Sequence, residues 1–286
     1  MTVFDDRRCE LGEGPLWHPE RGQLFWFDIL GGALLGRDGD RPLRWELGEL
    51  ASAAGWIDRE HLLVASETGL WRFGIATGQR ELVAALPNEG GRLRSNDGRA
   101  DPWGGFWIGI MSKKAEAGAG GIWRLWRGEL RRLLGGITIP NAICFDAGRE
   151  RAYFADTRAG TVWAQPLDPG TGWPAGEPRA FLELAEAGFH PDGAVVDAEG
   201  RIWNAQWGAG RVACYDPDGR FVRAERFGAT RTSCPAFGGA GLDRLFVTTA
   251  QEGMDADGRR AEPQAGMTFA RDLDVCGVAE PAVVLG

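Results

Sequence analysis

The 286-residue sequence predicts an all-β fold, a six-bladed β-propeller. A short aromatic and β-branched run recurs six times, each after an acidic or Gly-rich turn. The runs are Gly22–Asp28, Glu60–Ser66, Gly105–Gly109, Arg151–Asp156, Gly200–Asn204 and Asp243–Thr248. Their spacing of roughly 40 to 50 residues suits one four-stranded blade. The 44 Gly supply the positive φ angles that tight hairpins need, and the 13 Trp suit the half-buried surfaces between blades.

Each unit opens with a polar segment, which we expect to be a loop ahead of the first strand. These segments are Leu11–Trp17, Arg94–Arg99, Pro140–Cys144, His190–Ala194 and Ser233–Ala236 in units one, three, four, five and six. A second turn then leads into the aromatic run. Loops at the same place in successive blades lie on one face and point toward one axis.

The units follow one another without a linker, so we expect a single propeller domain over residues 1–286. The tail Ala282–Leu285 and the first residues are expected to share a blade and close the ring. Residues 251–260 are expected to form an excursion before the strand at Gly266–Ala270. No segment has a clear 3.6-residue apolar period, so helix should be scarce, at most one or two turns at Glu183–Ala187.

The composition excludes several classes of partner. A net charge of −8 with no clustered Lys and Arg argues against nucleic acid. No stretch approaches the roughly 20 apolar residues of a membrane span, and Met1–Glu10 lacks the apolar core of a secretory signal. The five Cys form no C-x-x-C pair, which favours free, mostly buried thiols. We therefore expect a cytoplasmic monomer or weak homo-oligomer.

Several common catalytic motifs are absent, among them G-x-S-x-G, H-E-x-x-H, the P-loop and G-x-G-x-x-G. Three His are too few for a His-rich zinc site, and His18 and His190, each ahead of a Pro, are interpreted as turn or surface residues. Nothing in the spacing of the five Cys suggests an activated nucleophile, so acyl-enzyme chemistry is disfavoured.

Oxygen donors remain in three of the opening segments. Glu13 lies between two Gly, Asn141 follows a Pro, and Asp192 stands in Pro-Asp-Gly. Equivalent places in a ring would bring all three to the axis, where two carboxylates and an amide suit a hard divalent cation such as Ca²⁺, Mg²⁺ or Mn²⁺. Taken singly, each residue has an ordinary alternative as a turn former.

Phrases over nearly the whole chain resemble the SMP-30/gluconolactonase/regucalcin-like (LRE-like) family. They are Leu11–Trp17, Arg94–Pro102, Gly105–Met111, Pro191–Gly200, Ile202–Trp203, Gly208–Val212, Ser233–Gly239, Leu245–Ala250 and Glu262–Gly266. The resemblance implies a six-bladed propeller with one axial divalent ion (Ca²⁺, Mg²⁺, Mn²⁺, Zn²⁺ or Fe²⁺) and hydrolysis of a small-molecule sugar lactone.

The resemblance also implies roles for individual residues. The metal ligands would be Glu13, Asn141 and Asp192, with Asp192 also acting as the catalytic base. Arg94 and Asn96 would bind the sugar, and Glu116 is the best match to a further contact. Trp103 and Trp207 are candidates for stacking on a sugar face.

Two departures from the family pattern and two rival functions stay open. The usual Asn-Gly pair is Asn141-Ala142 here, which costs free energy if that φ is positive. The segment Lys113–Gly121 is short, which puts the identity of the lactone in doubt. The rivals are a non-catalytic Ca²⁺-binding or regulatory propeller and a protein-interaction scaffold, since fold does not settle function.

Overall fold

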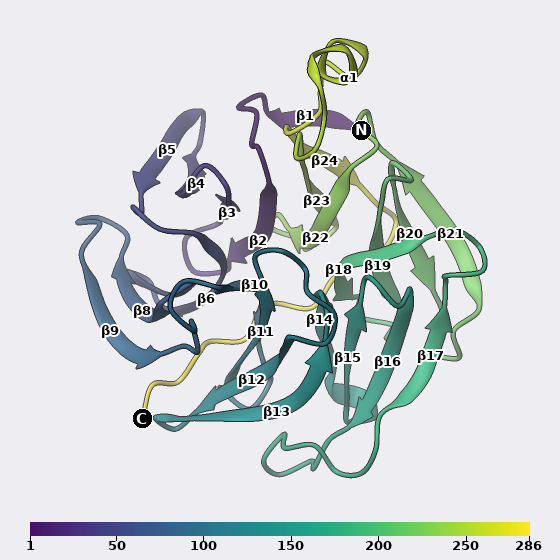
Figure 1. Ribbon diagram of the computed structural model, residues 1–286. Helices are drawn as coiled ribbons and strands as arrows, with labels where there is room; N and C mark the ends of the chain where they lie inside the picture. Colours follow the sequence, from purple (N-terminus) through teal and green to yellow (C-terminus); the bar gives the residue numbers. More distant parts are fainter.

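Six antiparallel four-stranded sheets surround one axis in the computed structural model, which describes residues 1–286, and form a six-bladed β-propeller (Figure 1). Blade 1 is β2 (Gly12–His18), β3 (Gln23–Asp28), β4 (Ala33–Asp38) and β5 (Arg41–Glu46), and blade 2 is β6 (Ala51–Asp58), β7 (His61–Ser66), β8 (Gly69–Gly74) and β9 (Arg80–Ala85). Blade 3 is β10 (Leu93–Ala100), β11 (Phe106–Ser112), β12 (Gly120–Trp126) and β13 (Glu129–Ile137), and blade 4 is β14 (Pro140–Asp146), β15 (Arg151–Asp156), β16 (Thr161–Pro166) and β17 (Arg179–Glu183). Blade 5 is β18 (His190–Val196), β19 (Ile202–Trp207), β20 (Arg211–Tyr215) and β21 (Phe221–Arg226), and blade 6 is β22 (Thr232–Gly238), β23 (Arg244–Thr249), β24 (Thr268–Asp272) and β1 (Thr2–Asp5).

Blade 6 closes the ring, because its outermost strand β1 comes from the first residues of the chain and pairs with β24. The expectation that the first residues join the last blade is confirmed. The expectation that Ala282–Leu285 shares that blade is wrong. The tail instead crosses the far side of the ring, where Val283 N bonds to Trp56 O and Val284 N bonds to Gly104 O, each at 2.8–2.9 Å (Figure 1, yellow).

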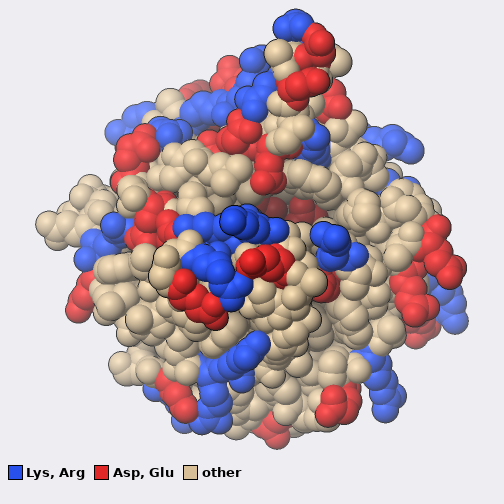
Figure 2. Space-filling model, viewed as in Figure 1, with Lys and Arg blue, Asp and Glu red and all other residues tan.

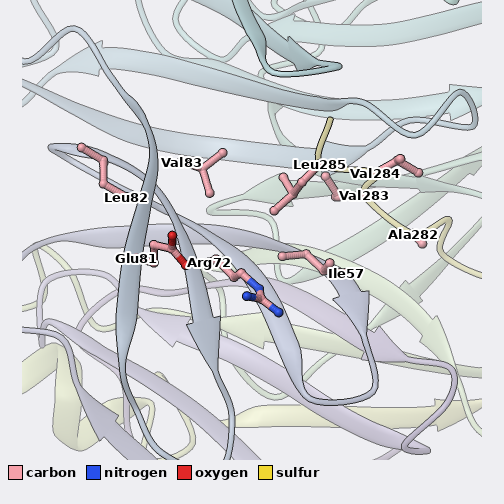
Figure 3. Close-up of a pocket in the computed structure, with 9 residues that line it drawn as sticks. All are labelled: Ile57, Arg72, Glu81, Leu82, Val83, Ala282, Val283, Val284 and Leu285. Atoms are coloured by element: carbon pink, nitrogen blue, oxygen red, sulfur yellow. The ribbon is translucent and has the colours of Figure 1, made fainter.

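The tail lies beside blade 2 and leaves an apolar cavity of about 600 Å³ between them (Figure 3). Ile57, Leu82 and Val83 line one side and Val283–Leu285 the other. The only charged side chains in its lining are Arg72 and Glu81. This lining offers no convergent set of oxygen donors, so it is not the candidate site.

The aromatic runs form the second strand of every blade, β3, β7, β11, β15, β19 and β23. The polar segments ahead of them are not loops, as the sequence had suggested, but the innermost strands, which contact one another around the axis. Their Gly, Pro and Asn residues resemble turn signals because every innermost strand contains an irregularity in its register.

These β-bulges set where the polar side chains lie. In β2, Glu13 pairs with Phe27 and Leu16 with Phe25, so two residues face one. Asn141 precedes the bulge of β14 just as Glu13 precedes that of β2. Asn96 and Asp192 are one position further along, as the first bulged residues of β10 and β18. The sequence had treated Glu13, Asn141 and Asp192 as equivalent, and only the first two are.

Helix is scarce, as expected. It is limited to one turn of 3₁₀ helix (Ala147–Arg149) and α1 (Ala256–Ala261), which falls in the predicted excursion. Glu183–Ala187 contains no helix. None of the helices has the length and apolar character needed to cross a membrane. Four of the five Cys are buried, Cys276 is exposed, and none is in a disulfide, as predicted.

Candidate functional site

A cavity of about 470 Å³ opens where the inner strands of blades 1, 3, 4 and 5 converge. Its lining is mostly polar, and its residues are Leu11, Glu13, Arg94, Asn96, Met111, Lys113, Ala115, Ile139, Asn141, Thr157, Arg158, His190, Asp192, Trp207 and Glu252. The face seen along the axis has a central hollow with acidic side chains in its depth and Lys and Arg side chains at its rim (Figure 2). A concave site with convergent polar groups is the arrangement expected for a small ligand.

Two carboxylates, Glu13 and Asp192, are buried in this cavity. Burial, with the charge of Asp97 adding to it, raises the pKa of Glu13 to about 8. Burial and the nearby charge of Glu13 raise the pKa of Asp192 well above its usual range. Glu13 accepts a bond from Gly14 N at 2.9 Å, and neither carboxylate has an Arg or Lys salt-bridge partner. Burial and the repulsion between the two groups therefore shift the pair toward its protonated forms.

A chain of hydrogen bonds runs across the cavity from blade 3 to blade 4. Arg94 Nη1 donates to Asn96 Oδ1 at 2.7 Å, and Asn96 Nδ2 donates to Asn141 Oδ1 at 2.9 Å. All three side chains are buried, and burial lowers the pKa of Arg94. The chain holds the guanidinium and both amides in fixed orientations before any ligand arrives.

Three residues that the sequence did not single out make hydrogen bonds to these groups or to the strands that carry them. Thr157 Oγ1 accepts from Asn141 Nδ2 at 2.7 Å, and Asp97 Oδ2 accepts from Ile143 N, in the bulge of β14, at 2.6 Å. Asn204 Nδ2 donates to the carbonyl oxygen of Asp192 at 2.9 Å. Thr157 directly follows the strand β15, and no spacing in the sequence distinguishes it from an ordinary turn residue.

The structure gathers five of the six predicted site residues in one cavity: Glu13, Arg94, Asn96, Asn141 and Asp192. Glu116 does not line it. Its carboxylate accepts from Ser112 Oγ at 2.8 Å and pairs with Arg92, and its side chain is 46% exposed. A contact between Glu116 and the sugar therefore needs the Lys113–Gly121 segment to move, and the assignment stays a prediction.

The lining also contains three charged residues that the sequence did not single out and one of the two Trp that it proposed for stacking. Lys113, Arg158 and Glu252 lie in it, the Lys113 ammonium pairing with Glu67. Trp207 lines the cavity, whereas Trp103 lies outside it and bonds to Pro169 O at 2.8 Å. Cavity-lining residues of this kind come from loops that the linear order separates, so only the fold brings them together.

The expectation that His18 and His190 are turn or surface residues holds for only one of them. His190 is exposed and lines the cavity. His18 is fully buried beside Trp56, with Nε2 3.0 Å from the Asp58 carbonyl oxygen. The expectation is wrong for His18, because it is the last residue of β2 and packs against Phe25 and Trp56 before the turn begins at Pro19.

The donor set fits a hard divalent cation. Nowhere does the structure gather three or more His, Cys, Asp or Glu side chains into a metal-binding cluster, so a metal here needs the amide oxygen of Asn141 as well as Glu13 and Asp192. The pKa of Glu13 stays raised although the charge of Arg94 acts to lower it, so a further positive charge in the cavity would stabilise the ionised carboxylates. An all-oxygen set of this kind suits Ca²⁺, Mg²⁺ or Mn²⁺ better than a soft metal.

The fold and this cavity define a propeller with an axial small-molecule site. Residues 11–251 match the model of the family described as "SMP-30/Gluconolactonase/LRE-like region". The chain is 42% identical over 282 residues to a putative sugar lactone lactonase of Rhizobium meliloti, covering 98% of this chain and 96% of that protein. It is 36% identical to a pentonolactonase of Haloferax volcanii, covering 98% and 97%.

A solved structure of a calcium-binding protein, regucalcin, from Agrobacterium tumefaciens superposes with a TM-score of 0.97 at 40% identity, covering 99% of this chain and 97% of the other. The chain belongs to the SMP-30/gluconolactonase/LRE-like family.

Proposed function

We propose that this protein hydrolyses a sugar (aldono-)lactone to the aldonic acid with the help of one divalent metal ion. The observation that carries the proposal is that Glu13 and Asp192, buried without an Arg or Lys salt bridge, share one cavity with the Arg94–Asn96–Asn141 hydrogen-bond chain. Carboxylates alone would suit a metal store, but the fixed guanidinium and amides add the directed polar groups that a polyhydroxylated ligand needs. The names of the relatives, which include sugar lactone lactonase and pentonolactonase, support this choice.

Glu13, Asn141 and Asp192 would hold the metal, and when bound it would supply the positive charge that polarises a lactone carbonyl. Asp192 would accept the proton of the attacking water through its free carboxylate oxygen. Asn204 donates to the carbonyl oxygen of Asp192 and so fixes the main chain from which this carboxylate extends. Only a modest base is needed, since lactones are activated esters.

Arg94 and Asn96 would hold the ring hydroxyl groups of the substrate. Arg94 is buried and already bonded to Ser95 O and Asn96 Oδ1, so little side-chain entropy is lost when a ligand binds. Trp207 at the mouth offers an aromatic face for the apolar side of a sugar. Glu116 is a further proposed contact.

A pH-indicator assay with a panel of aldonolactones, run on wild type with and without a chelator, tests the proposal. We expect acid release that chelator abolishes and added divalent metal restores. Asp192→Asn should lower kcat at least about 100-fold, because it removes a proton acceptor and a ligand charge. Asp218→Asn, an exposed turn substitution in the same blade, is the matched control and should leave the rate unchanged.

Metal binding without turnover of any lactone would favour the regulatory Ca²⁺-binding alternative instead. Turnover that survives both chelation and Asp192→Asn would contradict the assigned roles. The panel should include glucono-, xylono- and arabinonolactones, since one pocket side chain can discriminate between them.

A further inference from the structure

We propose that Thr157 is a positioning residue that fixes which atom of the Asn141 amide faces the metal. The inference rests on the metal centre of the proposed function and assigns a role to a residue outside its ligand set. Thr157 lies directly after β15 of blade 4, and its hydroxyl is within 2.7 Å of two atoms, Asn141 Nδ2 and the carbonyl oxygen of Pro191. It thus connects one expected ligand to the main chain next to another, Asp192.

The direction of these hydrogen bonds is fixed from both ends of the chain. Arg94 only donates, so Asn96 must present Oδ1 to it and Nδ2 to Asn141. At the other end the Pro191 carbonyl only accepts, so the single hydroxyl proton of Thr157 goes there. The Thr157 oxygen is then left to accept from Asn141, which must turn its Nδ2 toward Thr157.

The directions of these hydrogen bonds determine which atom of the Asn141 amide faces the metal site. The Oδ1 atom of Asn141 accepts one bond from Asn96 and keeps its second lone pair. The amide therefore offers oxygen rather than NH₂ to a cation in the cavity. Without Thr157, only the bond from Asn96 would hold the Asn141 amide, and any rotated fraction would present its NH₂ group, which repels a cation. Partners behind a ligand typically change metal affinity by about 10- to 100-fold.

Two substitutions at this position separate orientation from packing. Thr157→Val keeps the shape of the side chain and removes both hydrogen bonds, whereas Thr157→Ser keeps the hydroxyl and removes a methyl group. Thr161→Val, on β16 of the same blade and outside the cavity lining, is the matched control for the substitution itself.

Titration of Mn²⁺ into each metal-free protein, followed by electron paramagnetic resonance of free Mn²⁺, tests the inference without any substrate. We expect Thr157→Val to weaken Mn²⁺ binding by about 10-fold, while Thr157→Ser and Thr161→Val stay within about 2-fold of wild type. The melting temperatures of the metal-free variants, measured in parallel, should be similar, which a purely structural role for Thr157 does not predict.

Equal Mn²⁺ affinity in Thr157→Val and wild type would overturn the inference alone. The inference would also be overturned if Thr157→Ser lost as much Mn²⁺ affinity as Thr157→Val. A wild type that does not bind Mn²⁺, Ca²⁺ or Mg²⁺ would overturn the metal centre of the proposed function, and this inference with it. Binding without lactone turnover would overturn the proposed catalysis and leave the role of Thr157 standing.

Discussion

Single residues carry both the chemistry and part of the pH response of this protein. Around the axis, the same buried environment that raises the pKa values of Glu13 and Asp192 makes these residues suitable for a cation. Outside the cavity, His18 shows what burial does to a group of the opposite charge type. Its Nε2 faces the Asp58 carbonyl, and its Nδ1 is buried without a partner.

His18 is therefore neutral in the folded protein, with its proton on Nε2, and burial lowers its pKa below the ordinary value. Between that lowered pKa and about 6.5, the unfolded chain binds more protons than the folded one, so the free energy of unfolding rises with pH. We expect the stability contributed by neutral His18 to be complete above about pH 7 and to be lost as pH falls through 6.5. In urea titrations from pH 5 to 7.5, His18→Gln should show a shallower dependence on pH than wild type.

Wild type and His18→Gln share every other group that titrates in this range. The difference between their two curves of unfolding free energy against pH therefore isolates His18. Parallel curves for His18→Gln and wild type would contradict the assignment of a buried neutral imidazole.

At the scale of elements, the β-bulges of the innermost strands place the polar side chains of the site. Each bulge bends the strand and turns its side chains toward the axis. Neighbouring bulges are also tied together, since Asp97 in the bulge of β10 accepts from Ile143 N in that of β14. This local irregularity explains why the sequence resembled loops at these places: residues that break the β ladder are the same types that form turns.

Two equivalent bulge positions, Gly14 and Ala142, have φ angles of 54° and 55°. Gly14→Ala would place a Cβ 2.2 Å from the carbonyl oxygen of Ser52, so we expect it to lower the free energy of unfolding by more than about 2 kcal/mol. Ala142→Gly should relieve about 1 kcal/mol of left-handed strain, which loss of a buried methyl group worth about 0.8 kcal/mol nearly offsets. Urea unfolding of the metal-free proteins should thus show a change within about 1 kcal/mol for Ala142→Gly.

The departure from Asn-Gly at Asn141-Ala142 is accordingly tolerated because the fold accommodates this methyl group, which is fully buried. A loss above 2 kcal/mol in Ala142→Gly, or none in Gly14→Ala, would show that the two bulges are not equivalent.

At the scale of the whole molecule, the sequence predicted the six blades and most of the site because both depend on a repeat. The aromatic runs mark each second strand, and the inner strands ahead of them bring Glu13, Asn141 and Asp192 to one cavity. Features outside the repeat were missed or misplaced. Thr157 and Glu252 enter the site from segments with no repeating signal, and the path of the tail depends on contacts between residues more than 100 positions apart.

The tail contributes one member of a buried ion pair at the far end of the inner strands. Glu280 pairs with Arg99 of β10, whose guanidinium also donates to the carbonyl oxygens of Ile143 and Ala194 at 3.2 Å. The Arg99 and Glu280 side chains are only 9% and 8% exposed. Arg99, paired with Glu280 of the tail, thereby connects blade 3 to blades 4 and 5.

Removing one partner of a buried pair is costly because it leaves the other charge without compensation, whereas replacing both with apolar groups is often tolerated. We expect Glu280→Gln to lower the free energy of unfolding by about 3 kcal/mol, and the double variant Arg99→Met/Glu280→Leu to lose less than Glu280→Gln alone. Urea unfolding of the three proteins in the presence of chelator measures both effects apart from metal binding.

If Glu280→Gln were as stable as wild type, another group would have to compensate the charge of Arg99. Buried Asp97 is a candidate, because it lies close in sequence and its charge acts on Arg99. The tail would then hold the ring through Val283 and its main-chain bonds to Trp56 rather than through the ion pair.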